Sequence, residues 1–317
     1  MCYFHNNIMG RKSQFPGGDH LEYILRTSKL TKTYGTTRAV DMVSMQIKKG
    51  EIYGFIGKNG AGKTTLMRLV LGTAVPDIGK IELFGGVPLS EARHRIGALL
   101  EYPCLYKNCS AFENLRRFAV LTDTNDKSIE LILKLVGLEK AGNKSVGDFS
   151  LGMKQRLGIA IALLGNPEFL ILDEPINGLD PAGIKEIRDL ILMLNREYGV
   201  TFLISSHLLD ELAKIVTTYG IIRDGKLIEQ ISAEELQDRC RHQLIVRTDD
   251  TQKALEVLSE MTDPDDISVE DDTLYLYSLL DQSAEVNRRL NAAGVGVSEL
   301  TIRSDRLEEY FIERLDR

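Results

Sequence analysis

The residues best suited to chemistry lie between residues 57 and 65, where the spacing is G-x-x-x-x-G-K-S/T. Glycines let a backbone turn tightly and approach a ligand, so that successive amide N–H groups point into one concavity that accepts phosphate oxygens. In this pattern Lys63 reaches the β- and γ-phosphates and the Thr64 hydroxyl binds Mg²⁺. The spacing predicts a nucleotide-phosphate loop made of Gly57, Asn59, Gly60, Ala61, Gly62, Lys63, Thr64 and Thr65.

The elements on either side of this loop suit the same chemistry. The apolar, β-prone run Ile52–Ile56 predicts a strand before it, and the apolar spacing of residues 66–71 predicts a helix after it. A helix that starts there adds the positive end of its dipole to the site. The competing interpretation, a glycine-rich turn with an incidental lysine, is disfavoured by these flanks.

A pair of carboxylates follows a second apolar run. Residues 169–172 predict a fully buried strand, and Asp173 and Glu174 stand at its C-terminal end. Ligands bind at that end of parallel α/β sheets, and paired acids there would be costly if they were merely buried. We expect Asp173 to hold Mg²⁺ through water and Glu174 to orient or polarise the attacking water. Together with the loop, these residues supply the parts for phosphoryl transfer to water.

Two further residues suit the same site on weaker evidence. His207 follows the predicted strand 200–204 and could sense or stabilise the γ-phosphate, but a lone histidine is a weak signal. Tyr34 lies upstream of the loop and could stack on a nucleotide base, whereas a tyrosine at a strand end usually only packs. Residues 101–106, Glu-Tyr-Pro-Cys-Leu-Tyr, suit either a partner contact or a local apolar cluster.

The composition limits the classes of protein to which this chain can belong. The 317 residues are 43% hydrophobic and 27% charged, which predicts a folded protein with a large core and room for a second domain. A net charge of −7 argues against a broad nucleic-acid-binding surface, so no nucleic-acid partner is expected. No apolar run approaches the length of a membrane span, and no secretory signal is evident. The four cysteines lack metal-ligand spacing and predict free thiols in a reducing compartment.

The pattern of the chain predicts three regions. Residues 1–21 read as a flexible N-terminal tail, and residues 22–235 contain every candidate site residue, with strands expected at 22–30 and 39–47 and helical structure at 114–138. Residues 236–317 predict a small α+β domain, because its elements follow the βαββαβ order of a ferredoxin-like sandwich before a last helix. No catalytic constellation occurs there, so dimer contact, regulation and partner docking all stay open.

The ordered motifs of residues 22–235 resemble those of the nucleotide-binding subunits of ATP-binding-cassette (ABC) transporters. Tyr34 is similar to the adenine-stacking aromatic residue, residues 57–65 to the Walker A loop, and Asp173 with Glu174 to Walker B and the catalytic glutamate. Residues 149–156 resemble the family's signature, residues 178–180 its D-loop, and His207 its switch histidine.

The resemblance implies an α/β fold: a P-loop NTPase cassette with a RecA-like core, an antiparallel β subdomain and a helical subdomain, followed by the small α+β domain. It implies ATP and Mg²⁺ as ligands and ATP hydrolysis as the reaction. It also implies two partners, a separate integral membrane permease and a second copy arranged head to tail, in which Ser150 and Gly152 cover the other copy's ATP. The expected location is the cytoplasmic face of the cell membrane.

Two departures narrow the resemblance. The signature, usually Leu-Ser-Gly-Gly-Gln, reads Phe-Ser-Leu-Gly-Met, although Ser150 and Gly152 remain. Glu101 stands where the family has its Q-loop glutamine, and adds negative charge beside the phosphates. Both features are similar to bacitracin-resistance and lantibiotic-immunity exporters, so a peptide antibiotic is the expected cargo.

Three alternatives compete with this expectation. Export of another cargo, such as a drug, a lipid or a polysaccharide, stays open because the permease selects the cargo. A cassette protein that regulates translation is disfavoured, because such proteins carry two cassettes and this chain has one phosphate loop. A DNA-repair cassette is disfavoured, because no long heptad insertion separates residues 65 and 150.

Overall fold

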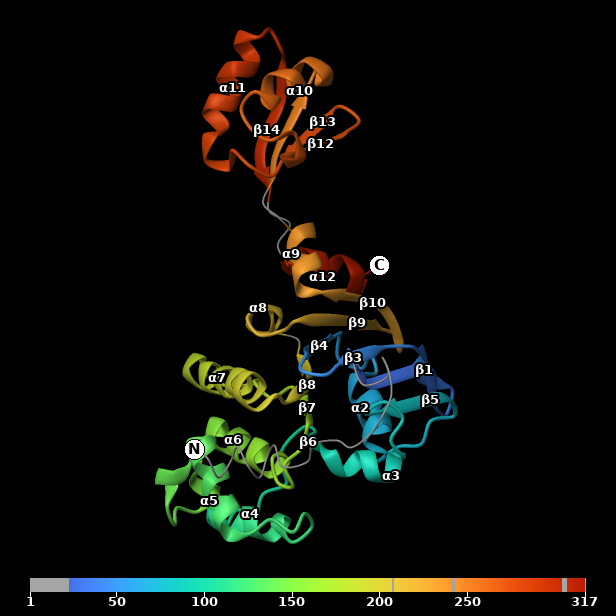
Figure 1. Cartoon of the computed structure of the whole chain (residues 1–317), viewed down its shortest axis with the longest axis vertical. Coiled ribbons are helices and arrows are strands. Elements are labelled where there is room, and N and C mark those ends of the chain that lie inside the picture. The colour runs from blue at the N-terminus through green and yellow to red at the C-terminus, as the bar shows by residue number, and fades with distance from the viewer. Residues whose placement is uncertain (1–22, 207, 241–242, 304–306, 317) are drawn as a thin grey trace. The chain divides into compact units, whose positions relative to one another are not determined.

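The computed structural model describes residues 23–206, 208–240, 243–303 and 307–316 (Figure 1). The chain forms two compact units, of which the larger runs to Ala233 and takes in the chain end from Arg314, while the smaller is Glu234–Glu313. The last helix was expected wholly in the C-terminal domain, but its final residues group with the larger unit. The expected N-terminal tail and His207 lie outside the described residues, and the division at residue 235 into folding domains stays a prediction.

The larger unit is built on a six-stranded sheet in the order β10-β9-β4-β8-β7-β6. Its neighbouring strands run parallel except for the antiparallel pair β9 and β10. β4, β7 and β8 are buried along their whole length, which explains their continuous apolar sequences. The bounds are β4 (Ile52–Ile56), β6 (Ile96–Leu99), β7 (Phe169–Asp173), β8 (Thr201–Ser206), β9 (Thr218–Arg223) and β10 (Lys226–Ser232).

A second, antiparallel sheet is centred on β1 (Tyr23–Tyr34), which pairs with β2 (Thr37–Val43), β3 (Gln46–Lys48) and β5 (Ile78–Leu83). The expected single strand at 39–47 is therefore two strands. The Thr27 hydroxyl explains the break, because it donates to the Val43 carbonyl (3.1 Å) and accepts from the Met45 amide (3.0 Å). β1 is also longer than expected and ends at Tyr34.

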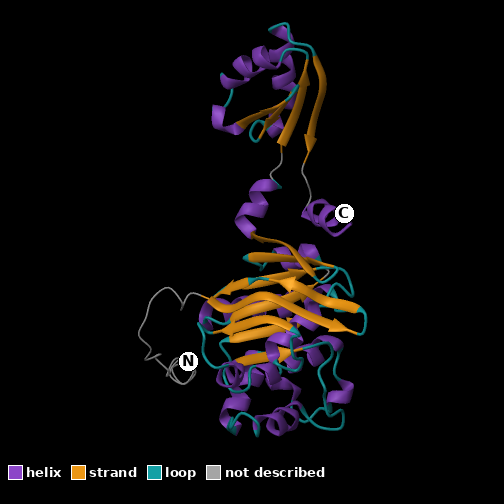
Figure 2. Ribbon diagram, turned by 90° about the vertical axis from the view of Figure 1, so that its right-hand side faces the viewer, coloured by secondary structure: helices purple, strands orange, loops and turns teal. Residues whose placement is uncertain are grey.

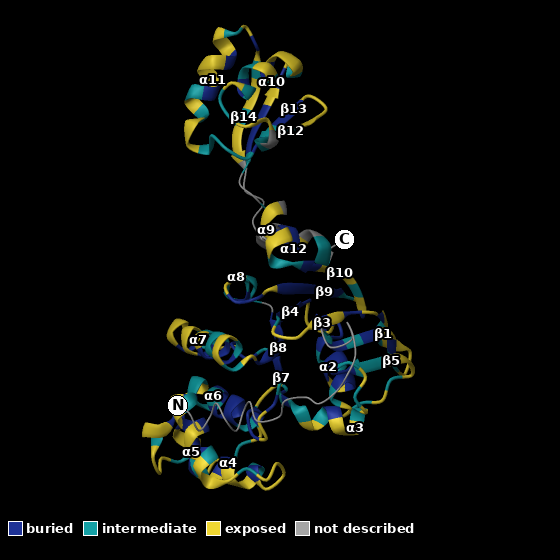
Figure 3. Cartoon of the chain, viewed as in Figure 1, coloured by how far each residue is buried: buried dark blue, intermediate teal, exposed yellow. Residues whose placement is uncertain are grey.

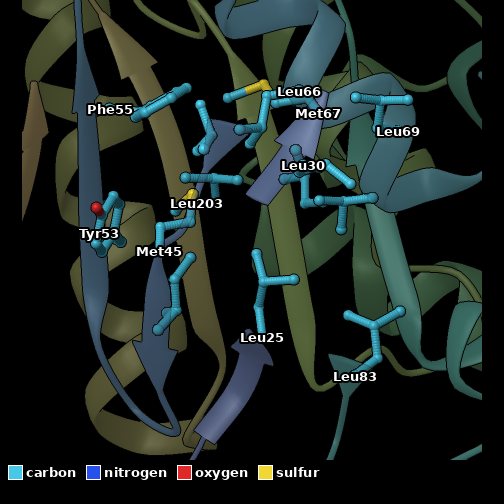
Figure 4. Close-up of a cluster of buried hydrophobic side chains, with 14 of the residues drawn as sticks. Leu25, Leu30, Met45, Tyr53, Phe55, Leu66, Met67, Leu69, Leu83 and Leu203 are labelled. Carbon is cyan, nitrogen blue, oxygen red and sulfur yellow. The ribbon is translucent and has the colours of Figure 1, made fainter. Parts of the chain in front are cut away.

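One apolar cluster joins both sheets to helix α2 (Lys63–Leu71), as Figure 4 shows. It anchors the helix that begins directly after the phosphate loop, so the core determines where that loop lies. The labelled side chains come from both sheets, from α2 and from the turn before β3: Leu25, Leu30, Met45, Tyr53, Phe55, Leu66, Met67, Leu69, Leu83 and Leu203.

Helices α4 (Ala111–Ala119), α5 (Asp126–Leu135) and α6 (Leu151–Ala162) lie together in the larger unit (Figure 1). The helical stretch expected at 114–138 is two helices, because Asn125 caps the second by accepting from the Ser128 amide (3.0 Å). Their outward sides are exposed, whereas the central strands are buried (Figure 3). The remaining helices of this unit are α3 (Leu89–Ala92), α7 (Pro181–Tyr198) and α8 (Leu209–Ala213).

The smaller unit has the expected βαββαβ order, with an antiparallel sheet β12-β13-β11-β14 and two helices (Figure 2). This strand order is that of a ferredoxin-like fold. Across the described residues of both units, no helix is long and apolar enough to cross a membrane. The bounds are β11 (Gln243–Thr248), α10 (Thr251–Ser259), β12 (Ile267–Glu270), β13 (Thr273–Leu276), α11 (Ser283–Ala292) and β14 (Val297–Arg303), with α9 (Ala233–Arg239) and α12 (Leu307–Asp316) at its ends.

Candidate nucleotide-binding site

The glycine-rich loop connects the end of β4 to the start of α2. Gly62 has a φ of +106°, and a Cβ atom there would lie 2.2 Å from the Ala39 carbonyl oxygen. A Cβ atom on Gly57 would lie 2.5 Å from the Ile222 carbonyl oxygen. Glycine is therefore required at both positions by the surrounding backbone. No side chain caps α2, which leaves its first amide groups to a ligand.

Lys63 is held across the loop by backbone carbonyl groups. Its ammonium group donates to the carbonyl oxygens of Gly57 (2.5 Å) and Lys58 (3.3 Å) and lies 3.9 Å from Glu174 Oε1. Burial lowers the pKa of Lys63, while the charges of Glu174 and Asp173 act in the opposite direction. The lysine is 6% exposed, so its ammonium group is pre-oriented and largely shielded from water.

Three adjacent elements bring hydroxyl and carboxylate oxygens together. Thr64 Oγ1 donates to Asp173 Oδ2 (2.6 Å), and Ser205 Oγ donates to Asp173 Oδ1. Ser205 also accepts from the Glu174 amide (2.9 Å), so it links both acids. Hard oxygen ligands are what Mg²⁺ prefers, and Thr64 with Asp173 would hold the ion in this donor set. No role was predicted for Ser205, because its only signal in the sequence was its place after an apolar run.

Glu174 and Glu101 both adopt left-handed backbone conformations, with φ of +51° and +58°. Such conformations are uncommon for non-glycine residues and cluster at functional sites. Each follows the C-terminal end of a parallel strand, β7 for Glu174 and β6 for Glu101. Arg68 Nη2 on α2 donates to Glu101 Oε1 (2.8 Å) and partly neutralises the negative charge of Glu101.

A cavity of about 300 Å³ lies at this edge of the sheet. It brings together nine of the predicted residues: Asn59, Gly60, Gly62, Lys63, Thr64, Thr65, Glu101, Asp173 and Glu174. It also includes five residues that the sequence did not assign to it: Ala39, Lys58, Tyr102, Gln155 and Asn177. Gln155 lies within residues 149–156, which resemble the signature, and Asn177 follows Glu174 by three residues, so their places in the sequence were the available signal.

The other predicted residues lie outside the lining of this cavity. Gly57 and Ala61 belong to the loop but do not line the cavity. Tyr34 is half-exposed at the end of β1, and Lys32 Nζ lies 5.4 Å from the centre of its ring. Ser150 caps α6 by accepting from the Met153 amide (3.3 Å). A Cβ atom on Gly152 would make only ordinary van der Waals contacts, 3.8 Å from Leu179 Cδ2 and 3.9 Å from Gly183 Cα, so a small side chain has room there. The roles expected of these residues stay predictions.

Known proteins with similar sequences are ATP-binding subunits of transporters, as the arrangement of this site predicts. Residues 40–177 match the sequence pattern of the ABC transporter family. The chain is 44% identical over 295 residues to the bacitracin transport ATP-binding protein BcrA of Bacillus licheniformis, covering 92% of this chain and 96% of that protein. It is 40% identical over 225 residues to the lantibiotic transport ATP-binding protein SrtF of Streptococcus pyogenes, covering 70% and 98%.

The fold is also that of a solved cassette. The structure of cbiO1 from Clostridium perfringens, part of the ABC transporter complex cbiONQ, matches with a TM-score of 0.62 and 31% identity, covering 68% of this chain and 91% of that one. The expected cassette fold is thereby confirmed. The chain belongs to the ABC transporter family, as an ATP-binding and ATP-hydrolysing subunit.

Proposed function

We propose that this ATPase powers a separate integral membrane permease that exports a peptide antibiotic of the bacitracin or lantibiotic type. The observation that carries the proposal is the 44% identity to a bacitracin transport ATP-binding protein over 92% of the chain, a share too large to leave out most of the smaller unit. Export of a drug, a lipid or a polysaccharide is the alternative, because the permease contacts the cargo. The subunit would work at the cytoplasmic face of the membrane.

The site residues divide the reaction among them. Lys63 and the amides of the loop would bind the β- and γ-phosphates, and Thr64 with Asp173 would hold Mg²⁺. The bound ion supplies neutralisation of phosphate charge. Glu174, beside the buried ammonium group of Lys63, would orient and polarise the attacking water. Tyr34 would stack on the adenine, and His207 would steady the γ-phosphate.

A second copy of the chain would complete each site. Within one chain, Ser150 and Gly152 lie outside the cavity lining, and a Cβ atom on Gly152 would approach no other atom more closely than 3.8 Å. A head-to-tail dimer would place this helix start over the other copy's γ-phosphate, where its amides form an anion site and exclude bulk water.

The permease contact is assigned to the segment after Glu101. Tyr102 is 71% exposed and Tyr106 is 51% exposed, so the interpretation as a purely internal apolar cluster is disfavoured. Asn114 holds the backbone of Tyr106 on both sides, accepting from its amide (2.8 Å) and donating to its carbonyl (3.1 Å). The segment therefore offers an ordered aromatic surface next to the nucleotide cavity.

Complementation tests the proposal. Cells that lack this chain would receive the wild type or Glu174→Gln and then be challenged with bacitracin, a lantibiotic and an unrelated drug. We expect the wild type to restore tolerance to a peptide antibiotic alone, and Glu174→Gln to restore none. Tolerance restored only to the unrelated drug would reassign the cargo. Equal tolerance with both proteins would overturn ATP-powered export.

A further inference from the structure

Helix α6 carries one polar residue at its first turn and another in the wall of the nucleotide cavity. Ser150 caps its first turn, and Gln155, five positions later in the sequence, lines the nucleotide cavity of the same chain together with Glu101, Asp173 and Glu174. One rigid helix thus joins the residue expected to face a second copy to a residue of the chain's own site.

The amide of Gln155 has unused hydrogen-bonding capacity. The residue is 2% exposed, and its side-chain oxygen has no hydrogen-bond partner within the described part of the chain. Buried polar groups nearly always have a partner, so an unsatisfied one at a cavity wall is a candidate to hydrogen-bond whatever binds in that cavity. A glutamine amide can both donate and accept, and therefore suits a phosphate oxygen or a water bound to it.

Close packing ties α6 to the loop that carries Glu101. A Cβ atom on Gly158 would lie 2.9 Å from Pro103 Cβ and 3.0 Å from Leu99 Cδ1. Leu99 and Pro103 stand on either side of Glu101 in the sequence. Because packed interiors transmit displacement rather than absorb it, the helix and this loop would shift together.

We infer that Gln155 senses the nucleotide of its own chain and, through α6, sets the position of Ser150 for a second copy. Its amide hydrogen-bonds the bound nucleotide or a water on it, and this contact holds α6 in the orientation that favours dimerisation. Each site would then control the helix that completes the other. The inference rests on the proposed function, which places ATP in this cavity and Ser150 at the other copy.

The test uses Gln155→Met, which keeps the length of the side chain and removes the amide. It is made in a Glu174→Gln background, so that hydrolysis does not interfere. Two quantities are measured: the Kd for MgATP at protein concentrations too low for dimerisation, and the ATP concentration at half-maximal dimerisation by sedimentation velocity. Gln237→Met on α9, an exposed position, is the matched control.

We expect Gln155→Met to raise the Kd by about threefold to tenfold, the size of one lost hydrogen bond. The dimerisation midpoint should rise by a larger factor, and the control should change neither quantity. A midpoint that rises only in proportion to the Kd would overturn the link to Ser150. A Kd equal to that of the background protein would overturn the sensing role.

Gln155→Glu is the second variant, because it keeps the shape of the side chain. Its added charge should weaken MgATP binding, and unchanged binding would overturn the contact even if Gln155→Met failed to fold. Failure of the proposed nucleotide site or dimer is recognised separately, because the Glu174→Gln parent itself would then not bind MgATP or not dimerise. Failure of the export proposal is recognised by the complementation test and would leave both measurements unchanged.

Discussion

Arg68 Nη2 lies 2.8 Å from Glu101 Oε1, so the carboxylate at the Q-loop position is ion-paired to the helix that follows the phosphate loop. The pair spans α2 and the loop after β6, which are the two elements that a γ-phosphate would approach. If ATP binds in this cavity as proposed, Arg68 would offset part of the repulsion between the Glu101 carboxylate and the phosphates.

Removing the arginine should increase the repulsion between Glu101 and the phosphates of ATP. We expect Arg68→Gln to weaken MgATP binding by about twofold to fivefold, a modest effect because the pair is half-exposed. Glu101→Gln added to Arg68→Gln should restore most of the loss. The measurement is a double-mutant cycle on the Kd for MgATP, with Arg116→Gln as the control, because Arg116 forms an exposed pair with Asp126 on other helices. Additive effects of the two changes would show that the pair does not protect the site.

The proposed role of Glu174 predicts a separation of binding from turnover. Glu174→Gln removes the carboxylate that polarises water, and the ATPase rate should fall by about a hundredfold or more. Binding of MgATP should be kept and a dimer should accumulate, as phosphate release and sedimentation would report. Glu197→Gln, an exposed change on α7, should leave both unchanged. A Glu174→Gln protein that turns over like the wild type would remove this residue from the mechanism.

Ser205 predicts an effect on magnesium dependence. Ser205→Ala leaves Asp173 and the Glu174 amide without their shared hydroxyl, which should lower the free energy of unfolding by about 1–3 kcal/mol. The Mg²⁺ concentration for half-maximal ATPase activity should also rise, because Asp173 loses its orientation. Ser206→Ala is the matched control, since its hydroxyl accepts from the Leu208 amide instead (3.0 Å). Equal magnesium dependence in both variants would contradict the orienting role.

Lys63 predicts a pH dependence with a definite sign. Burial lowers the pKa of Lys63 from 10.5, so its charge is lost on raising the pH before that of an ordinary lysine. Bound phosphates favour the ammonium form, and ATP binding should therefore weaken with rising pH and take up a proton. Calorimetry at about pH 9 in buffers of different ionisation heat would measure this uptake. Lys63→Arg keeps its positive charge at this pH, so its affinity for ATP, whatever its value, should not change with pH. The same pH dependence in both proteins would show that another group takes up the proton.

Gly152 separates folding from dimerisation. Because a Cβ atom at Gly152 has room in the single chain, Gly152→Ala should keep the melting temperature or raise it slightly. It should nevertheless weaken ATP-dependent dimerisation if another copy's nucleotide approaches this helix start. Gly62→Ala, where the Cβ atom would clash with the Ala39 carbonyl, should instead destabilise the fold. Normal dimerisation of Gly152→Ala would argue against the head-to-tail arrangement.

Local sequence was sufficient to predict the strands and the loop that carry the candidate site residues. The strand Ile52–Ile56 has the predicted bounds, and Phe169–Asp173 extends one residue beyond the predicted run 169–172, because short apolar runs buried on both faces are recognisable without their neighbours. The glycine-rich loop was equally clear, since its conformation depends on residues that lie next to one another. The break between β2 and β3 was missed, because Thr27 causes it from another strand.

Only the tertiary structure decided which side chains meet. Thr64 and Asp173 are 109 positions apart, and their contact depends on the strand order β4-β8-β7, which no periodicity encodes. The same strand order places Ser205 beside Asp173 and Glu174. The packing of the helices brings Gln155 into the lining of the cavity and Arg68 against Glu101. The sequence by itself thus determined the family of reaction and its local parts, while the partners of each charged group follow from long-range packing.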